Sequence, residues 1–152
     1  MNIQPGQQAL RKGRVSIPGQ IYLVTTATNN RRPIFADWSV AHTAVQTFTS
    51  PRVLQQTRLL CWVLMPDHVH WLIQVDQQTL SGEVKRLKAA TAREINRRFG
   101  STGSLWQPGF HDRAIRRDED IRQVARYIVA NPLRAGLVEH IGNYPFWDAA
   151  WL

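Results

Sequence analysis

The sequence predicts a single α+β domain of ferredoxin-like type, in which helices sandwich an antiparallel sheet. Short β-branched and apolar runs alternate with segments of helical periodicity, in the order strand, helix, strand, strand, helix, short strand, helix. Hydrophobic residues make up 43% of the chain, which is enough for a packed core. The 152 residues suit one domain, and no linker or low-complexity tract divides them.

The first elements are two strands on either side of a helix. Residues 21–28 are β-branched and apolar, which predicts a strand. Apolar side chains recur at helical spacing over residues 37–49. Residues 59–65 form a continuous apolar run, typical of a strand buried on both faces. Pro66 and Asp67 suit a two-residue turn, so this strand forms a hairpin with the next one.

The second strand of the hairpin covers residues 68–75 and alternates along its length. One face is apolar, and the other carries His68, His70, Leu72 and Gln74. The two imidazoles therefore leave the sheet on the same side, about 7 Å apart along the strand. We expect this face to be exposed, with both rings able to converge on one metal ion. Two polar histidines with satisfied hydrogen bonds would give the same pattern, and a metal site needs a third ligand.

A long amphipathic helix is predicted over residues 79–99. Its apolar stripe consists of Leu80, Val84, Leu87, Thr91 and Ile95. The opposite face is basic and carries Lys85, Arg86, Arg93 and Arg97. A loop over residues 100–109 and a short strand over 113–115 follow this helix.

The last predicted helix covers residues 119–131, with Asp118 as its N-cap. It ends at Asn131 because Pro132 disfavours helical geometry in the residue before it. Tyr127 and Asn131 are one turn apart and lie on the flank of the apolar stripe. Neither residue by itself indicates a functional site. A tyrosine beside a core stripe usually packs its ring, and asparagine before proline is a common helix end.

The charge pattern favours a polyanionic partner. Nineteen Lys and Arg against eleven Asp and Glu give a net charge of +8 and a pI near 10.8, which points to nucleic acid or an anionic membrane surface. A basic N-terminal arm, at about residues 1–18, contains Arg11, Lys12 and Arg14 and no acidic residue. The chain has no run of apolar residues long enough to span a membrane and no secretory signal, and its single cysteine excludes a disulfide framework. We therefore expect a cytoplasmic protein.

The candidate residues make chemical sense as a set. His68, His70 and Asn131 form a neutral N, N, O group, which suits a divalent cation acting as a Lewis acid. Tyr127 within reach of that cation would be a covalent nucleophile, because a cation and a basic surface both favour the phenolate. The polarised group would then be a phosphodiester, in keeping with the charge. The combination indicates DNA strand cleavage through a phosphotyrosine.

Three motifs resemble those of one enzyme family. The HVH segment at residues 68–70, after MPD, resembles the HUH motif (U, hydrophobic) of the single-tyrosine HUH transposases. Residues 127–137 (YIVANPLRAGL) resemble the nucleophile helix of their REP-associated tyrosine transposase branch, and residues 106–112 (WQPGFHD) resemble a loop signature of that branch. The resemblance covers nearly the whole chain, from Arg11 to Asp148.

The resemblance implies an HUH endonuclease fold and a metal-dependent endonuclease and strand transferase for single-stranded DNA. His68 and His70 would bind Mg²⁺ or Mn²⁺, with Asn131 as third ligand, a position often held by Gln in related insertion-sequence transposases. Tyr127 would attack the DNA, leaving a 5′-phosphotyrosine and a free 3′-OH, and no nucleotide cofactor would be needed. The implied substrate is the repetitive extragenic palindrome (REP), a short imperfect hairpin with a single-stranded foot.

The basic segments and one aromatic residue would then contact DNA. Phosphate contacts are expected from Lys85, Arg86, Arg93 and Arg97. Trp106 could stack on an unpaired base, although it could equally anchor its loop in the core. The N-terminal arm would lie on the DNA through Arg11, Lys12 and Arg14.

Two other functions stay open. A non-catalytic hairpin-DNA-binding regulator would lose nothing without Tyr127, and a metal-dependent nuclease that activates water would form no covalent adduct. Related insertion-sequence transposases pair two subunits and swap their tyrosine helices, whereas the REP-associated branch is monomeric. The short connection from Gly109 to Asp118 favours a tyrosine that acts in its own subunit, and therefore a monomer.

Overall fold

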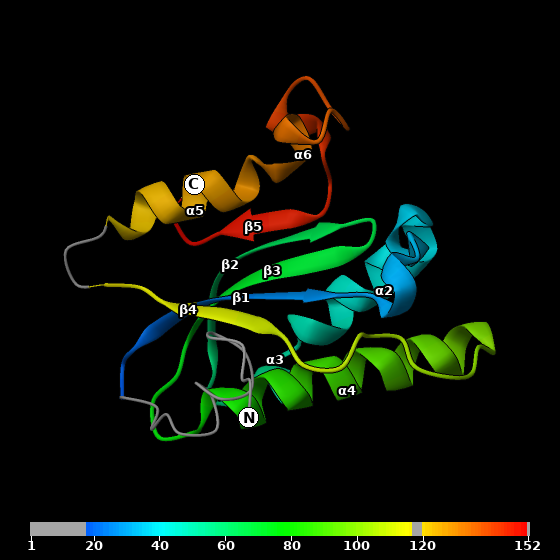
Figure 1. The fold of residues 1–152 in the computed structure, drawn as a ribbon, viewed down its shortest axis with the longest axis horizontal. Coiled ribbons are helices and arrows are strands. Elements are labelled where there is room, and N and C mark those ends of the chain that lie inside the picture. The colour runs from blue at the N-terminus through cyan, green and yellow to red at the C-terminus, as the bar shows by residue number, and fades with distance from the viewer. Residues whose placement is uncertain (1–17, 117–119, 152) are drawn as a thin grey trace, which may run out of the picture.

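One antiparallel sheet organises residues 18–116 and 120–151, which the computed structural model describes (Figure 1). Its strands are β1 (Ile21–Ala27), β2 (Arg58–Met65), β3 (His68–Gln74), β4 (His111–Ala114) and β5 (Trp147–Ala149). Their order across the sheet is β4-β1-β3-β2-β5, so β3 is the central strand. The helices are α2 (Trp38–Phe48), α3 (Pro51–Leu54), α4 (Leu80–Phe99), α5 (Ile121–Val129) and α6 (Asn131–Arg134), with short 3₁₀ turns at η1 (Asn29–Arg31), η2 (Ile34–Ala36) and η3 (Ile141–Asn143).

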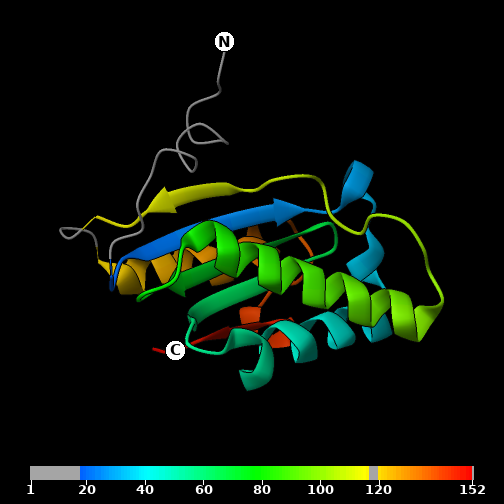
Figure 2. The ribbon, with the colours of Figure 1, turned by 90° about the horizontal axis from the view of Figure 1, so that it is seen from below.

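The predicted α+β class and antiparallel sheet are confirmed. β1, α2, β2, β3, α4 and β4 follow the β-α-β-β-α-β order of ferredoxin-like folds. Helices α2 and α4 cover one face of the sheet and α5 covers the other (Figures 1 and 2). The sequence pattern does not indicate β5, because three residues are too few to show alternation. This strand adds to the edge of the sheet by pairing with β2.

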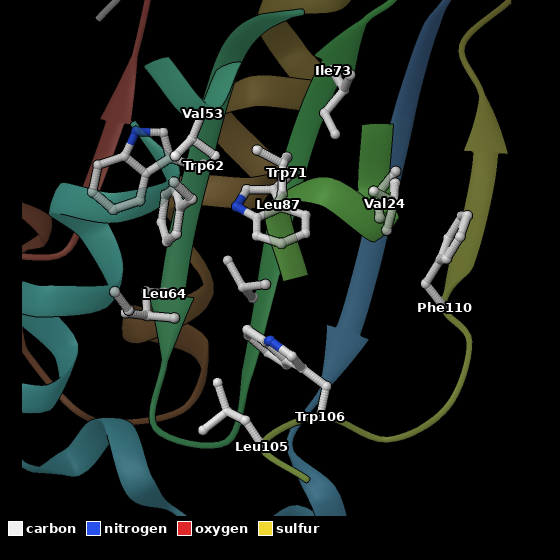
Figure 3. Close-up of a cluster of buried hydrophobic side chains, with 14 of the residues drawn as sticks. Val24, Val53, Trp62, Leu64, Trp71, Ile73, Leu87, Leu105, Trp106 and Phe110 are labelled. Carbon is white, nitrogen blue, oxygen red and sulfur yellow. The ribbon is translucent and has the colours of Figure 1, made fainter. Parts of the chain in front are cut away.

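The larger core lies between the sheet and helices α2 and α4 (Figure 3). Trp71 of β3 is fully buried at its centre, with its ring 5.5 Å from that of Phe48 and 6.3 Å from that of Trp106. The stripe predicted for α4 is buried at every position, namely Leu80, Val84, Leu87, Thr91 and Ile95. Among the described residues, no helix is both long and apolar enough to cross a bilayer.

A smaller core lies on the opposite face of the sheet, under α5. Leu72 of β3 packs there with Cys61 and Val63 of β2 against Ala125 and Ile128 of α5. The expectation that this strand face is exposed is therefore wrong. α5 is apolar on one side only, and it buries that side against the sheet. The two histidines of β3 thus lie beside a packed layer.

The start of each long helix follows an N-cap side chain. Asp37 accepts backbone N–H groups at the start of α2, and Thr79 does so at the start of α4. At α5 the cap is Asp120, whose carboxylate accepts the N–H of Arg122 at 2.9 Å. The predicted cap, Asp118, lies outside the described residues. α5 thus begins two residues later than the sequence pattern predicts.

The end of α5 also differs from expectation. The helix ends at Val129, and Asn131 is the first residue of α6. Pro132 is the cause, because it has no N–H to donate and therefore fits the first turn of a new helix. Ala130 links the two helices, and α6 contacts both α5 and β2.

Candidate active site

His68 and His70 project from the central strand toward the face that α5 covers. Their ring centroids lie 4.9 Å apart, with the ring planes at 85°. Leu72, the next residue on this face, is part of the smaller core, so the histidines stand where that core ends.

A carboxylate orients the first imidazole. The Nδ1 atom of His68 donates to Oδ1 of Asp67 at 2.7 Å, and Oδ2 of Asp67 pairs with Nε of Arg31 at 3.2 Å. Because a carboxylate only accepts, the proton of a neutral His68 sits on Nδ1. The lone pair of Nε2 is then available to a metal ion, which is the usual arrangement around a metal-binding histidine.

The second imidazole is held by the neighbouring strand. Thr25 of β1 lies opposite His70 in the sheet, and its Oγ1 atom is 2.8 Å from Nδ1 of His70. Burial lowers the pKa of His70 to about 4, with smaller contributions from His68 and from the charge of Arg134. His70 is therefore neutral at physiological pH, as a metal ligand must be.

Asn131 is the third ligand that the sequence predicts. Its Nδ2 group donates to the carbonyl of Ile128 at 3.1 Å, which leaves Oδ1 as the atom available to a cation. Within residues 18–116 and 120–151, no cluster of three or more His, Cys, Asp or Glu side chains is placed to hold a metal. A cation bound by His68 and His70 would therefore take its other ligands from Asn131, water or substrate oxygens. The neutral N, N, O set fits a divalent cation with open coordination positions.

Tyr127 lies on the outer side of α5 with an arginine over its ring. The tyrosine is 64% exposed, and Cζ of Arg134 lies 3.8 Å from the ring centroid. The charge of Arg134 also contributes to the lowered pKa of His70, so this cation lies near both residues. Sequence reasoning missed Arg134 as a site residue. No sequence pattern indicates this contact, because the helix breaks at Ala130 between the two residues, and the packing of α6 beside α5 decides it.

The comparisons with known proteins identify the family of the chain. The family model described as "Transposase IS200 like" matches residues 17–131, which is most of the chain and includes both histidines, Tyr127 and Asn131. The chain belongs to the IS200-like transposase family. The resemblance carried by the three sequence motifs is thereby confirmed.

Relatives of this transposase fall in the REP-associated branch. A REP-associated tyrosine transposase of Escherichia coli K12 is 26% identical over 137 residues, which cover 88% of this chain and 78% of the relative. A solved REP-associated tyrosine transposase bound to a REP hairpin has a TM-score of 0.69 at 24% identity and covers 88% of this chain and 79% of its own. A crystal structure from Deinococcus radiodurans, described as a transposase, has a TM-score of 0.57 at 26% identity, with coverages of 76% and 93%.

The residues predicted to contact DNA differ in their exposure in the transposase fold. Arg11, Lys12 and Arg14 lie outside the described residues. Lys85, Arg93 and Arg97 are exposed on α4, as expected. The expectation that Trp106 stacks on an unpaired base is corrected. Only 6% of Trp106 is exposed, and its Nε1 atom donates to the carbonyl of Lys88 at 3.1 Å. Its ring packs in the larger core, so Trp106 anchors its loop and has no face free for a base.

The structure also corrects the expectation that Arg86 contacts DNA phosphates. Its guanidinium donates to the carbonyls of Val53 at 2.7 Å and Leu54 at 2.9 Å, and it pairs with Glu83. Glu83 is only 3% exposed and also accepts a hydrogen bond from Thr57. Helical angle alone placed Arg86 opposite the apolar stripe, but α3 packs beside α4 and turns this position inward. Arg86 therefore ties α3 to α4 instead of facing DNA freely.

We expect Arg86→Ala to lower the free energy of unfolding by about 3 kcal/mol, because it leaves the carboxylate of Glu83 buried without its partner. The matched variant is Arg93→Ala, one of the exposed arginines of the same helix, which should change stability by less than about 0.5 kcal/mol. Urea unfolding followed by tryptophan fluorescence measures both. Equal stability of the two variants would contradict the structural role of Arg86.

Proposed function

We propose that this transposase is a metal-dependent single-stranded DNA endonuclease and strand transferase, which acts on REP-type hairpins through a 5′-phosphotyrosine. The observation that carries the proposal is the pair of imidazoles whose Nδ1 atoms are already engaged, together with an exposed tyrosine under Arg134, whose charge also acts on His70. The relatives support the substrate, since one is named a REP-associated tyrosine transposase and another is bound to a REP hairpin.

The reaction exchanges one phosphodiester for another. The Oη atom of Tyr127 attacks the phosphorus, the bond from phosphorus to the 3′ oxygen breaks, and the leaving oxygen takes up a proton as the phenol loses one. The products are a 5′-phosphotyrosine and a free 3′-OH. Attack by another 3′-OH on the phosphotyrosine reverses the step and joins new strands. Because the number of ester bonds is unchanged, the reaction needs no nucleotide cofactor.

The residues of the chain prepare the phosphate for attack. His68 and His70, with Asn131, would hold a Mg²⁺ or Mn²⁺ ion, which when bound polarises the non-bridging phosphate oxygens. Asp67 and Thr25 fix the orientation of the two imidazoles, and this orientation would determine the position of the bound ion.

Arg134 has two functions in this proposal. Its cation over the ring restrains the exposed side chain of Tyr127, which would otherwise sample several rotamers. The same charge attracts the phosphate to the nucleophile. Since α5 packs on the sheet of its own chain, we propose that Tyr127 acts with the histidines of its own subunit, in a monomer.

We expect Tyr127→Phe to abolish the covalent adduct, because it removes the nucleophilic oxygen while retaining the ring. The measurement incubates wild type and variant with labelled hairpin DNA carrying a single-stranded foot, plus Mn²⁺, and resolves the products on a denaturing gel. A protease-sensitive, shifted band should form with wild type alone. Equal cleavage by both proteins without an adduct would indicate a nuclease that activates water, and binding without cleavage would indicate a hairpin-binding regulator.

We expect Mn²⁺ to bind wild-type protein in isothermal titration calorimetry and His70→Ala to abolish that binding. Thr25→Val should weaken Mn²⁺ binding by about tenfold, because it removes the hydrogen bond that orients His70. Thr26→Val is the matched control, since this neighbour points to the other face of the sheet, opposite Val69. Unchanged Mn²⁺ affinity in His70→Ala would exclude the histidine pair as the metal site.

We expect Arg134→Gln to slow adduct formation by about tenfold, because the nucleophile loses both its restraint and its neighbouring charge. Arg134→Lys should recover part of the rate, since it restores the charge without the flat guanidinium. Arg126→Gln, an exposed arginine next to Tyr127 in the chain, serves as the control. A rate for Arg134→Gln equal to that of the control would show that the stacked arginine is incidental.

A further inference from the structure

The turn that follows β1 has an unusual backbone. Asn30 and Arg31 both adopt the left-handed conformation, with φ angles of 59° and 54°. Glycine adopts this conformation without strain and asparagine adopts it with little, whereas an arginine brings its Cβ atom too close to the backbone. Glycine at position 31 would therefore relieve strain that Arg31 maintains.

Hydrogen bonds on two sides hold the turn in this conformation. The N–H group of Thr28 donates to the carbonyl of Asp67 at 2.9 Å, which ties the turn to the one between β2 and β3. The N–H group of Asn29 donates to the carbonyl of Leu105 at 2.9 Å, which ties it to the loop before β4. The strained conformation persists because these neighbours determine it.

This conformation brings Arg31 to the carboxylate that orients the first imidazole. Nε of Arg31 lies 3.2 Å from Oδ2 of Asp67, while Oδ1 of the same carboxylate accepts from Nδ1 of His68 at 2.7 Å. One oxygen of Asp67 is thus engaged by the guanidinium and the other by the imidazole. The carboxylate cannot rotate about its last side-chain bond without losing one of these contacts.

Folding stability does not explain the ion pair between Arg31 and Asp67. The side chain of Arg31 is 56% exposed and that of Asp67 is 28% exposed. Ion pairs near the surface contribute little to stability, because water and salt screen them. A left-handed backbone at a residue with a Cβ atom costs at least as much as such a pair contributes. Strain that is not offset by stability is typical of a functional position.

We propose that Arg31 is a positioning residue, which holds Asp67 against His68 and so keeps the Nε2 lone pair of His68 directed at the metal position. The inference rests on the proposed function, since the cation belongs to that proposal. It also gives a role to the loop before β4, whose Trp106 is buried and has no face free for a base. This loop supports the turn from which Arg31 reaches Asp67.

The test compares two glycine substitutions in the same turn. Arg31→Gly removes the guanidinium and the strain together. The matched control is Asn30→Gly, at a left-handed residue whose side chain is exposed and has no hydrogen bond among the described residues. Because glycine suits both positions, each variant should melt at the temperature of wild type or above it.

We expect isothermal titration calorimetry to show that Arg31→Gly binds Mn²⁺ about tenfold more weakly than wild type, because the imidazole loses its support. Asn30→Gly should bind Mn²⁺ as wild type does. Arg31→Lys should recover part of the affinity, since it restores the charge beside Asp67 without the planar guanidinium. A melting temperature of Arg31→Gly well below that of wild type would overturn the proposal and make the ion pair a structural one.

A second measurement follows His68 in the metal-free protein. Long-range ¹H–¹⁵N correlation spectra at about pH 8.5, where an ordinary imidazole is neutral, show which ring nitrogen carries the proton. We expect Nδ1 to carry it in wild type and in Asn30→Gly, and a mixture of the two tautomers in Arg31→Gly.

A tautomer of His68 that is unchanged in Arg31→Gly would overturn the proposal. Unchanged Mn²⁺ affinity together with weaker binding of hairpin DNA would also overturn it, and would make Arg31 a phosphate contact instead. The failure of the proposed function has a different signature. A wild type that binds no Mn²⁺ would contradict its metal dependence, while the spectra of His68 would still decide the role of Arg31.

Discussion

The alternation of side chains along the central strand is the constraint on which the rest of the structure depends. β3 pairs with β1 and β2 along its length, and both of its faces are covered. Val69, Trp71 and Ile73 are fully buried in the larger core, so a shift of register by one residue would place them on the wrong face. The same alternation places His68 and His70 on the opposite face of the sheet. Core packing on one side thereby fixes the position of the candidate metal ligands on the other.

Register also determines which hydrogen bonds the two imidazoles make. Thr25 reaches His70 because β1 pairs with β3 in the register that sets these residues opposite each other. Asp67 reaches His68 because the Pro66–Asp67 turn is tight and its carbonyl accepts the N–H of Thr28 at 2.9 Å. One orienting group comes from β1 and the other from the turn between β2 and β3, so both belong to the frame of one sheet. A site built on such a rigid frame needs little reorganisation when a cation or phosphate arrives.

The arginines of the chain serve three purposes that composition cannot separate. Arg86 offsets a buried carboxylate and joins two helices, and its removal would weaken the fold. Arg134 stands over the candidate nucleophile. Arg52 and Arg93 are exposed in the hollow between α2, α3 and α4 and form no hydrogen bond within residues 18–116 and 120–151. A net charge of +8 therefore predicts the class of partner, whereas the partners of each guanidinium decide its role.

The sequence alone determined the features that arise within one element or between adjacent ones. The alternation predicted at residues 68–75 and the apolar stripe of α4 depend on local spacing, and the structure confirms the elements they predict. The tertiary structure decided what depends on elements far apart in the chain. α5 covers the histidine face, the core takes up the ring of Trp106, and α3 turns Arg86 inward. Periodicity defines the faces of a strand or helix, but only packing decides what each face meets.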